Sequence, residues 1–591
     1  MATENIIAEL EQKDGPVGLL AIAEHCNPDS FNNPNGRLKY LVMTQQKGRV
    51  LIVDCEKHSA ELGNVLTAIW RRKIVGHGLV RSLIALEGYG WMPEDRFCTE
   101  TASHLIHNGR GYSYELKSCV LRELKVKEER LGEKVEWSGP LNGALKNALG
   151  LRVNHMLELA GALAEKIEQE ELSKAWGVEM ELIPALCDLH CSGILVDRKK
   201  LESFKGRVET EVMMLRNDLK VRYGIKNPNS ARDIHSAFLR AGLEKASTRK
   251  VDLQEVDHPL ADSLVEFKEQ YSTGRSCKQL LDSVEEDGRA YSDYDPLKET
   301  GRVYTKSPNI QGLKKDQDLM ACLCAEDGKV WVRADYKQQE VRVLAAIAGD
   351  ERLIKVIRRG EDPLVEIAAA ILGKQTKEIA DTEREMGKQI FYANIYGCGL
   401  NRIVDIIRTR TGKDLGKGVV EQLLLRFEKE FEGVAAYVSG CWTALSTHRA
   451  IKVRGGGRRL LEIPAEPLGL EEEYLDLLLT QGGRNEEYDE ISSARTKRLG
   501  QLLNTPIQAG AAAGIKIAMS RIRSRLPDHA RLGLYLHDEL GVECLTEDAD
   551  KVGKVLAEEM IRAMVELFPE VKFDVDVCKG QNWAEMKELK V

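Results

Sequence analysis

The stretch that decides the fold is Val330–Asp350, which reads VWVRADYKQQEVRVLAAIAGD and changes from a strand pattern to a helix pattern within a few residues. Apolar and polar residues alternate up to Asp335, and from Val341 onward apolar residues recur at helical spacing. Asp335 therefore stands at the end of a strand, where a carboxylate can reach solvent and a metal ion while its backbone is held in place. Glu340 follows on the helix. The alternative for this stretch alone is an ordinary strand, turn and helix with a solvated acid.

Length and composition bound the class of protein. A chain of 591 residues exceeds a single hydrophobic core, so we expect two or more domains. The 43% hydrophobic and 30% charged content is typical of a soluble globular protein, and no apolar run approaches the ~20 residues of a membrane helix. The N-terminus, MATENIIAELEQKDG, lacks the features of a signal or transit peptide, so we expect a cytoplasmic protein. The net charge of −8 leaves nucleic-acid binding open, because only the surface along a duplex has to be basic.

The patterns along the chain predict a multidomain protein of the α/β and α+β classes. Residues 1 to about 172 alternate short strand patterns with helical stretches, which indicates a small α/β domain. From 173 to about 300 the pattern is mainly helical, and beyond that strands and long helices mix.

A loop precedes the deciding stretch. Thr300–Leu313, TGRVYTKSPNIQGL, carries Arg302, Asn309 and Gln311 between glycines and a proline. Such side chains can donate hydrogen bonds in a minor groove, where the acceptor pattern is shared by all base pairs. The alternative is a plain loop.

A third pattern is Thr382–Gly399, TEREMGKQIFYANIYGCG, which predicts a helix that ends at glycines. Arg384, Lys388, Tyr392 and Tyr396 are each four residues apart and therefore share one helical face. Two cations followed by two aromatic rings can pair with a triphosphate and stack on a sugar and base. An amphipathic helix with a solvated basic end is the alternative.

Near the C-terminus, residues 532–536 and 540–544 alternate apolar residues on either side of His537, Asp538 and Glu539, which predicts a hairpin with acids at its turn. Pairing of neighbouring strands can then bring Asp538 beside Asp335. Two adjacent carboxylates repel each other and are seldom structural unless a cation bridges them. Mg²⁺, which prefers oxygen ligands and shares carboxylates with substrate phosphates, is the expected cation.

Taken together, these segments resemble the family A DNA polymerases, the group of bacterial DNA polymerase I. DYKQQEVR is similar to the family's first carboxylate motif, REMGKQIFYANIYG to its fingers helix and HDE to its second carboxylate motif. Three further blocks resemble the segment before the first motif and later palm elements: TGRVYTKSPNIQ, LLNTPIQAGAAAGIKIAM and GQNWAEMK. The six blocks occur in the family's order over about 290 residues.

The resemblance implies a right-hand polymerase fold of palm, thumb and fingers over residues 173–591. The thumb would span about 201–299 and the fingers about 351–435, with the palm as the remainder. The implied activity is DNA-directed DNA synthesis by two-metal phosphoryl transfer, with two Mg²⁺ ions that Mn²⁺ can replace. The implied partners are primer-template DNA and deoxynucleoside triphosphates. We expect a monomer, and the sequence identifies no accessory protein.

The resemblance also implies roles for individual residues. Glu340 would be a steric gate against a ribose 2′-hydroxyl. The implied metal ligands are Asp335, Tyr336 and Asp538, and the implied catalytic residues are Asp335, Asp538 and Lys388. The implied nucleotide contacts are Arg384, Lys388, Tyr392, Tyr396, Glu340, Gln338 and His537. The implied DNA contacts are Arg302, Asn309, Gln311, Asn504, Gln508 and Glu539.

Four positions depart from the family's pattern. Lys337 stands where the family usually has Ser, Gln339 where it has Ile and Tyr392 where it has Phe. Gly500 replaces an Arg that the family often has, which puts a primer or template contact there in doubt. None of the four is an expected metal ligand.

The N-terminal region lies where the family carries a ribonuclease H-like 3′-to-5′ exonuclease domain. Proofreading needs about four carboxylates around two metals. The expected positions read Ala within Gly18–His25, Ser82 in the second block and Leu157 with Glu158 in the third, so we predict an inactive domain. Asp54 begins an Asp-x-Glu sequence, but one or two strands too late.

Three other functions were weighed against a DNA polymerase. A polymerase-shaped binding protein without activity is opposed by the intact acids and fingers cations. A single-subunit RNA polymerase is opposed by Glu340 as a sugar gate, and a nuclease by the missing N-terminal acids.

Overall fold

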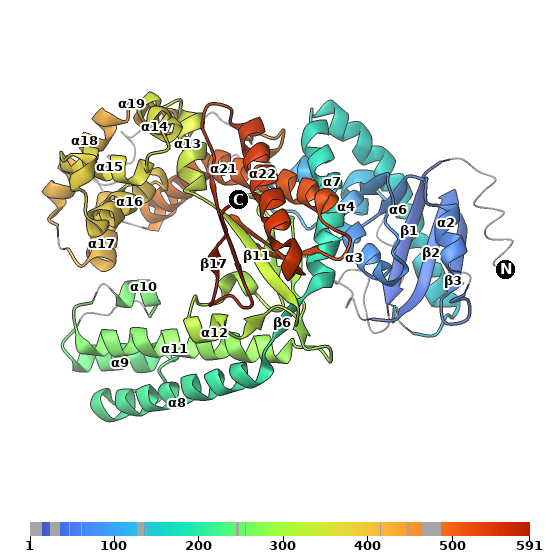
Figure 1. Cartoon of the computed structure of the whole chain (residues 1–591), viewed down its shortest axis with the longest axis horizontal. Helices are drawn as coiled ribbons and strands as arrows, with labels where there is room; N and C mark the ends of the chain where they lie inside the picture. The colour runs from blue at the N-terminus through green and yellow to red at the C-terminus, as the bar shows by residue number, and fades with distance from the viewer. Residues whose placement is uncertain are drawn as a thin grey trace.

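The computed structural model describes residues 15–23, 36–46, 48–60, 62–126, 135–137, 139–243, 248–254, 256–413, 415–445, 449–461 and 486–591. Figure 1 shows an N-terminal domain at one side of a central sheet, with two groups of helices extending from the other side. Among the described residues, no helix is both long and apolar enough to span a bilayer.

The N-terminal domain is built on a five-stranded sheet with the order β3-β2-β1-β4-β5. Strand β2 is antiparallel to both neighbours, whereas β1, β4 and β5 are parallel, as expected for a ribonuclease H-like α/β domain. The strands are β1 (Val17–Ala23), β2 (Leu38–Gln46), β3 (Arg49–Asp54), β4 (Ile74–Gly76) and β5 (Arg96–Cys98). The helices are α2 (Leu62–Ala68), α3 (Leu79–Ile84), α4 (Thr99–His107), α5 (Leu116–Leu124) and α6 (Gly143–Gln169).

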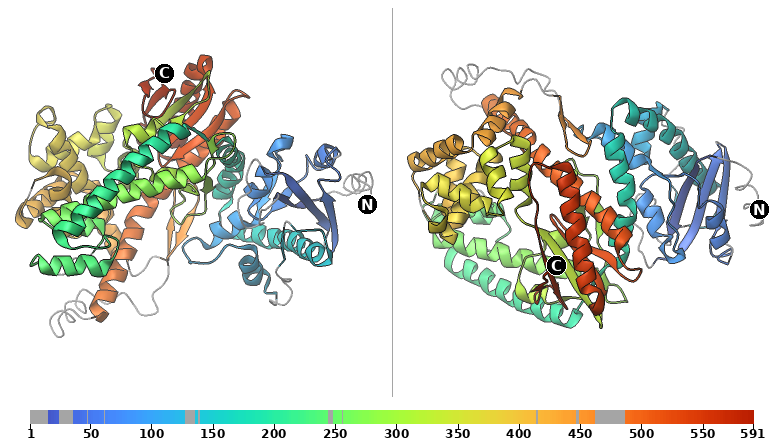
Figure 2. Two further views of the ribbon diagram at one scale, coloured as in Figure 1. Left: turned by 90° about the horizontal axis from the view of Figure 1, so that it is seen from below. Right: turned by 45° about the horizontal axis from the view of Figure 1, so that its top comes forward.

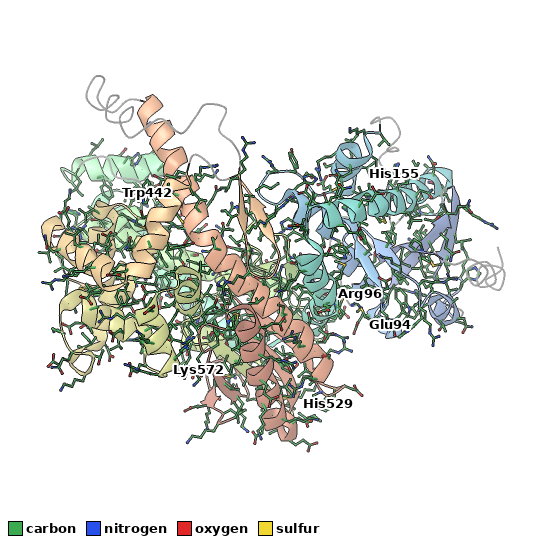
Figure 3. All side chains as sticks on the ribbon, turned by 90° about the horizontal axis from the view of Figure 1, so that it is seen from above. Glu94, Arg96, His155, Trp442, His529 and Lys572 are labelled. Atoms are coloured by element: carbon green, nitrogen blue, oxygen red, sulfur yellow. The ribbon has the colours of Figure 1, made fainter. Side chains whose placement is uncertain are left out.

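The two faces of β1 bury different residues, because side chains alternate along a strand. Val17, Leu19 and Ala21 pack in one core cluster with α2 and α3, while Leu20 and Ile22 pack in another with α6. In Figure 3, Arg96 and His155 mark this domain and Trp442 marks the opposite side of the molecule.

The central sheet, which we call the palm sheet, has the order β14-β15-β11-β16-β17 and is antiparallel throughout. Its strands are β11 (Lys329–Tyr336), β14 (Arg531–Leu536), β15 (Glu539–Leu545), β16 (Val575–Gly580) and β17 (Lys587–Glu588). The helices that pack against it are α7 (Ser173–Ser192), α21 (Glu486–Arg525) and α22 (Ala549–Leu567), and α13 (Gln339–Ala348) packs on α21. Helices α21 and α22 lie side by side in Figures 1 and 2.

The close packing of α21 on α22 explains the small residues of the GAAAG run. A Cβ atom at Gly514 would lie 2.1 Å from the sulfur of Met564 on α22. Any larger residue at this position would require the Met564 side chain to move.

The expected thumb is a long helical arm. Helices α8 (Arg198–Tyr223) and α11 (Pro259–Asp282) pack along each other, and α9 (Ala231–Arg240) and α10 (Lys250–Leu253) lie near their ends, as Figure 1 shows. A three-stranded sheet and a short helix lie at the base of this arm: β6 (Ile194–Val196), β7 (Arg289–Ala290), β10 (Leu323–Cys324) and α12 (Gln317–Met320).

The expected fingers are a compact group of helices on the other side of the palm sheet. They are α14 (Glu351–Arg358), α15 (Pro363–Leu372), α16 (Asp381–Ile395), α17 (Leu400–Thr411), α18 (Lys417–Glu430) and α19 (Glu432–Thr443). Their apolar side chains belong to the large core cluster that also contains the residues of the palm sheet facing α22, such as Val332 and Ala334.

A hairpin of β12 (Ala450–Lys452) and β13 (Arg458–Leu460) joins the N-terminal domain to the rest of the chain. The Nδ2 atom of Asn108 donates to the backbone carbonyls of Glu299 (3.2 Å) and Arg458 (3.1 Å). The backbone carbonyl of Asn108 accepts from the amide of Leu460 (2.7 Å). We call these three bonds the Asn108 clamp. Near the clamp, β8 (Asp293–Asp295) pairs with β9 (Tyr304–Lys306).

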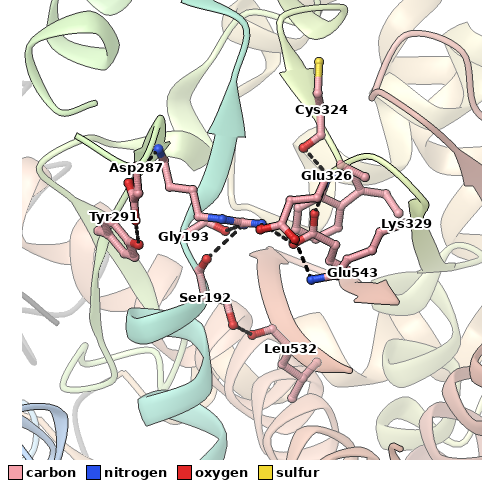
Figure 4. Close-up of polar contacts among 12 residues, drawn as sticks. Ser192, Gly193, Asp287, Tyr291, Cys324, Glu326, Lys329, Leu532 and Glu543 are labelled. Atoms are coloured by element: carbon pink, nitrogen blue, oxygen red, sulfur yellow. Dashed lines mark hydrogen bonds and ion pairs between the residues drawn. The ribbon is translucent and has the colours of Figure 1, made fainter. Parts of the chain in front are cut away.

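A buried arginine links the thumb base to the palm sheet, and Figure 4 labels its partners Ser192, Gly193, Glu326 and Glu543. Arg289 donates to the carbonyls of Ser192 and Gly193 at the end of α7, and to the carboxylates of Glu326 and Glu543. Because a buried guanidinium is costly unless its donors are satisfied, this arrangement holds the thumb base and the palm sheet together.

Candidate active site

Strand β11 separates core residues from site residues by simple alternation. Val332, Ala334 and Tyr336 are buried, and the Tyr336 hydroxyl donates to the carbonyl of Met560 on α22 (2.6 Å). Successive side chains of a strand point to opposite faces, so Arg333 and Asp335 lie on the face away from α22.

The predicted neighbourhood of the two acids is confirmed. Strand β15 pairs with β11 so that Asp335 lies opposite Glu539, the residue that follows Asp538. The amide of Tyr336 donates to the carbonyl of Asp538 at 3.3 Å. His537 and Asp538 form the turn between β14 and β15, as the sequence predicted.

The electrostatics of this pair are unfavourable in the protein alone. Part of the Asp335 side chain reaches solvent, but the surrounding protein keeps water from its carboxylate, and this desolvation raises its pKa. The negative charges of Asp538 and Glu539 raise the pKa further, to about 7. The pKa of Asp538 is also raised, first by burial and then by Glu340 and Glu539. Two acids held together in this way favour a cation between them.

The other acids around Asp335 have basic partners, which the sequence interpretation did not foresee. Glu539 forms an ion pair with Arg333, and Asp576, which lies opposite Asp335 on β16, forms one with Lys337 at 2.7 Å. The signal was present in the spacing, because Arg333 and Asp335 are two apart on β11 and Lys337, two further on, directly follows the strand.

The helix after the first acid begins with a fixed turn. Gln338 has a φ of +43°, and α13 starts at the next residue. Arg342 is buried and donates to the carbonyls of Lys337 (2.8 Å) and Lys572 (2.6 Å), the second of which is labelled in Figure 3. These bonds hold the backbone between Asp335 and Glu340.

Glu340 is held from two sides. Its Oε2 accepts a hydrogen bond from the Tyr396 hydroxyl (2.7 Å), and its Oε1 pairs with the guanidinium of Arg302. The expected sugar gate, fingers residue and DNA contact therefore meet at one carboxylate. Burial raises the pKa of Tyr396 first, and the charge of Glu340 raises it further, so the phenol remains a donor.

The predicted helix is present as α16, which carries Arg384, Lys388 and Tyr392, and Tyr396 directly follows its last residue. The rings of Tyr392 and Tyr396 stack with centroids 5.8 Å apart. Arg384 forms an ion pair with Asp362 at 2.8 Å, and Lys388 forms one with Glu385 at 3.3 Å. Asp362 was not a candidate in the sequence interpretation.

Two expected DNA contacts also support their own loop. The side chain of Asn309 accepts from the amide of Gly312 (3.1 Å). Gln311 donates to the carbonyls of Val303 (3.1 Å) and Tyr535 (3.3 Å), which fixes the loop against β14.

The remaining expected contacts lie on the turn and on α21. His537 has a φ of +60°, and burial followed by Arg302 and Lys315 lowers its pKa. Asn504 and Gln508 are half-buried on α21, and the Oδ1 atom of Asn504 has no hydrogen-bond partner among the described residues.

The donor set near the two acids suits a hard cation. Asp335, Asp538 and the backbone carbonyl of Tyr336 offer only oxygen atoms, which Mg²⁺ prefers. In the described ranges, no group of three or more His, Cys, Asp or Glu side chains could hold a metal. An ion at the pair would therefore take further ligands from backbone, water or substrate phosphates, as Mg²⁺ does.

In the N-terminal domain, the first two expected acid positions do meet. The Ser82 hydroxyl accepts a hydrogen bond from the amide of Ala21 on β1 (3.3 Å). Leu157 on α6 lies against Gly18, on the other face of β1. Residues 24 and 25, at the end of the quoted strand, lie outside the described residues.

Asp54 lies apart from these positions. It ends β3 and forms an ion pair with Lys57 at 2.6 Å, which lowers its pKa. Because β2 lies between β3 and β1, Asp54 is two strand spacings, about 10 Å, from the level of Ile22 on β1.

The fold is shared with a known polymerase structure. The POL domain of Pol1 from M. smegmatis, in complex with DNA primer-template and dNTP, matches with a TM-score of 0.81 and 20% identity. The match covers 98% of both chains.

Sequence comparisons give the family. The family model for DNA polymerase family A matches residues 198–585. DNA polymerase I from Aquifex aeolicus is 24% identical over 87% of this chain and 88% of its own length. The thermostable DNA polymerase I of Thermus filiformis is 26% identical over 70% of this chain, which spans about half of that relative (48%). The chain therefore belongs to DNA polymerase family A, the class of DNA-directed DNA polymerases.

Proposed function

We propose that the chain adds deoxynucleotides to the 3′ end of a primer on a DNA template, by two-metal phosphoryl transfer and without proofreading. The observation that carries the proposal is the acid pair Asp335 and Asp538. Among the described residues neither acid forms an ion pair, unlike Glu539 and Asp576, and Asp538 is close enough to raise the pKa of Tyr392 on the helix that carries Arg384 and Lys388.

Two Mg²⁺ ions, which Mn²⁺ can replace, would be held by Asp335, Asp538 and the carbonyl of Tyr336. When bound, they supply positive charge that favours the attacking primer oxygen and the leaving pyrophosphate. The raised pKa values of both acids support this role, because a divalent cation removes their mutual repulsion.

The chain's own contribution is positioning and electrostatics, as in other phosphoryl transfers. Arg384 and Lys388 bind the triphosphate, and the Lys388 ammonium offsets charge on the departing pyrophosphate. Tyr392 packs against the sugar and Tyr396 against the new base pair, with Gln338 and His537 lining the same pocket. Glu340, held by Tyr396 and Arg302, excludes a ribose 2′-hydroxyl.

Primer-template DNA would lie along the open face of the palm sheet. Arg302, Asn309, Gln311, Asn504, Gln508 and Glu539 are the proposed contacts. The thumb would be residues 201–299, the fingers 351–435 and the palm the rest of 173–591, in a chain that acts as a monomer.

Residues 1–172 are proposed to form an inactive exonuclease-type domain. Support comes from the Ala21 amide, which donates to the Ser82 hydroxyl where the resemblance places acids, and from Leu157 against the other face of the strand. Asp54 is satisfied by Lys57 and lies two strands away.

A primer-extension assay tests both parts of the proposal. The protein should extend a matched primer with deoxynucleotides, incorporate ribonucleotides poorly and leave a mismatched 3′ end in place. Failure to extend a matched primer with Mg²⁺ or Mn²⁺ would refute polymerase activity. Removal of the mismatched nucleotide before extension would refute the loss of proofreading.

A further inference from the structure

We propose that Asp362 is a positioning residue that presents the guanidinium of Arg384 to the triphosphate of the incoming nucleotide. The inference rests on the proposed function and goes beyond it, because it assigns a role to a carboxylate that does not itself touch substrate.

The contact between the two side chains is tight and directional. The Nε and Nη2 atoms of Arg384 both approach Oδ2 of Asp362 at 2.8 Å. The other carboxylate oxygen, Oδ1, accepts from the amide of Leu364 at 2.8 Å, so Asp362 caps the N-terminus of α15. With both oxygens engaged, the carboxylate has one orientation and holds the guanidinium in one plane.

Close helix packing brings the pair together. A Cβ atom at Gly387 would lie 2.7 Å from the Cβ of Ala368, so only glycine allows α16 to approach α15 this closely. Gly387 is one turn along α16 from Arg384, and Ala368 lies on the helix that Asp362 caps. The approach of the helices therefore places Arg384 beside Asp362.

The pair has little value as a stability device. The side chains of Arg384 and Asp362 are 28% and 32% exposed. Ion pairs that water reaches contribute little to folding, because solvent screens them and ordering two side chains costs entropy. A role in orienting Arg384 accounts for the geometry better than a role in folding.

The guanidinium retains donors for a second anion. Arginine has five N–H groups in a planar fork, and Asp362 takes only those along the Nε–Nη2 edge. The edge that carries Nη1 remains available for a phosphate, so Arg384 can bind the carboxylate and the triphosphate together. Lysine, a point charge on a flexible stem, could not keep this orientation.

Asp362 also lies at the right place. It lines a cavity of about 500 Å³ whose wall includes Tyr336, Lys337 and Gln338, the residues directly after Asp335. The cavity thus extends from the turn after Asp335 to the partner of Arg384, and Glu361, Asp574 and Asp576 also line it. A carboxylate here would repel phosphates if it were free, and its pairing with Arg384 removes that repulsion while fixing the cation.

The test uses Asp362→Asn, because asparagine caps a helix as well as aspartate but cannot form the ion pair. We expect the KM for a deoxynucleotide to rise about three- to tenfold with little change in kcat, the cost of ordering one free side chain on binding. The affinity for a fluorescent nucleotide analogue should fall by the same factor. In the Arg384→Ala background, Asp362→Asn should have no further effect on KM.

The matched control is Asp197→Asn. Asp197 caps α8 in the expected thumb and pairs with Lys200 at 3.2 Å, so it has the same two kinds of contact far from the nucleotide. Its KM should equal that of the wild type. An unchanged KM in Asp362→Asn, or an equal additional rise in the Arg384→Ala background, would overturn the inference. A wild-type protein that does not extend primers would refute the proposed function instead.

Discussion

In the palm, Asp335 and Asp538 lie side by side with raised pKa values, whereas the buried acid Glu123 of the N-terminal domain has a strongly lowered one. Burial alone would raise the pKa of Glu123, but hydrogen bonds from His107, Lys166 and Arg122 bring it to about 2. Three basic groups thus lie within 2.8 Å of one carboxylate.

The difference separates an acid that stabilises the fold from a pair of acids that we propose to hold metal ions. Both carboxylate oxygens of Glu123 accept hydrogen bonds within the domain. Glu123 therefore stabilises the fold and does not offer an oxygen to a ligand. The repulsion between Asp335 and Asp538 destabilises the protein by itself, and a bound cation would relieve it. Where the N-terminal domain would need such a pair, Ala21 meets Ser82 instead.

The largest expected effect is in the palm. Asp335→Asn and Asp538→Asn should each lower primer extension at least about a thousandfold, because each removes charge that the metal ions and the transition state share. Duplex binding, measured by fluorescence anisotropy, should remain near that of the wild type. Asp550→Asn, at an exposed acid on α22 paired with Lys579, is the control. Extension within tenfold of wild type in either palm variant would contradict the two-metal assignment.

The acid of the N-terminal domain should matter for folding instead. Glu123→Gln should lower the stability of that domain by about 2 kcal/mol, because it removes the charged acceptor of three partly exposed basic groups. Limited proteolysis and thermal unfolding measure this loss, and Glu202→Gln on the exposed face of α8 is the control. Extension per folded molecule should not change.

The pH dependence of that loss has a definite sign. The pKa of Glu123 is lowered in the folded state from 4.5 to about 2. Its contribution to stability is therefore complete above pH 4.5 and disappears as the pH falls through 2. A difference between wild type and Glu123→Gln that grew on acidification would reverse the assignment.

A smaller effect is expected at the sugar. Tyr392 can donate a hydrogen bond where a dideoxynucleotide lacks its 3′-hydroxyl, and its raised pKa, caused by burial and then by Glu340, keeps the phenol protonated. An unmet buried acceptor costs about 1–3 kcal/mol, so Tyr392→Phe should discriminate against dideoxynucleotides roughly ten- to hundredfold. The ratio of incorporation efficiencies for the two nucleotides measures it. A large ratio already present in the wild type would exclude this role of the hydroxyl.

The smallest expected effect is none at all. Labelled single-stranded DNA with Mg²⁺ or Mn²⁺ should stay intact in the wild type and in Asp54→Ala, because Asp54 is paired with Lys57 and lies apart from Ala21. Digestion from the 3′ end that is lost in Asp54→Ala but kept in Asp538→Ala would remove the contrast between the two regions.

Local patterns were enough to predict the elements that carry the site. The alternation before Asp335, the helical spacing after Val341 and the hairpin around Asp538 all correspond to β11, α13 and β14–β15. These predictions succeed because each depends on residues near in sequence and on one buried face.

The partners of the site residues could not be predicted in the same way. The pairing of Lys337 with Asp576 depends on the register of β16, some 240 residues later, and the contact of Arg384 with Asp362 depends on how two helices pack. The local sequence pattern determines neither the register of a distant strand nor the angle at which two helices pack. The meeting of Ala21 with Ser82 agrees with the family resemblance, which supplied long-range information.

The Asn108 clamp gives the N-terminal domain a structural role that does not depend on any chemistry of its own. A polypeptide shortened to begin after residue 172 would leave the carbonyls of Glu299 and Arg458 and the amide of Leu460 without the partners that Asn108 now provides. Such orphaned groups are costly where water cannot replace the lost partner. Natural selection acting only on DNA synthesis would therefore preserve the Asn108 clamp, and with it this domain as scaffolding.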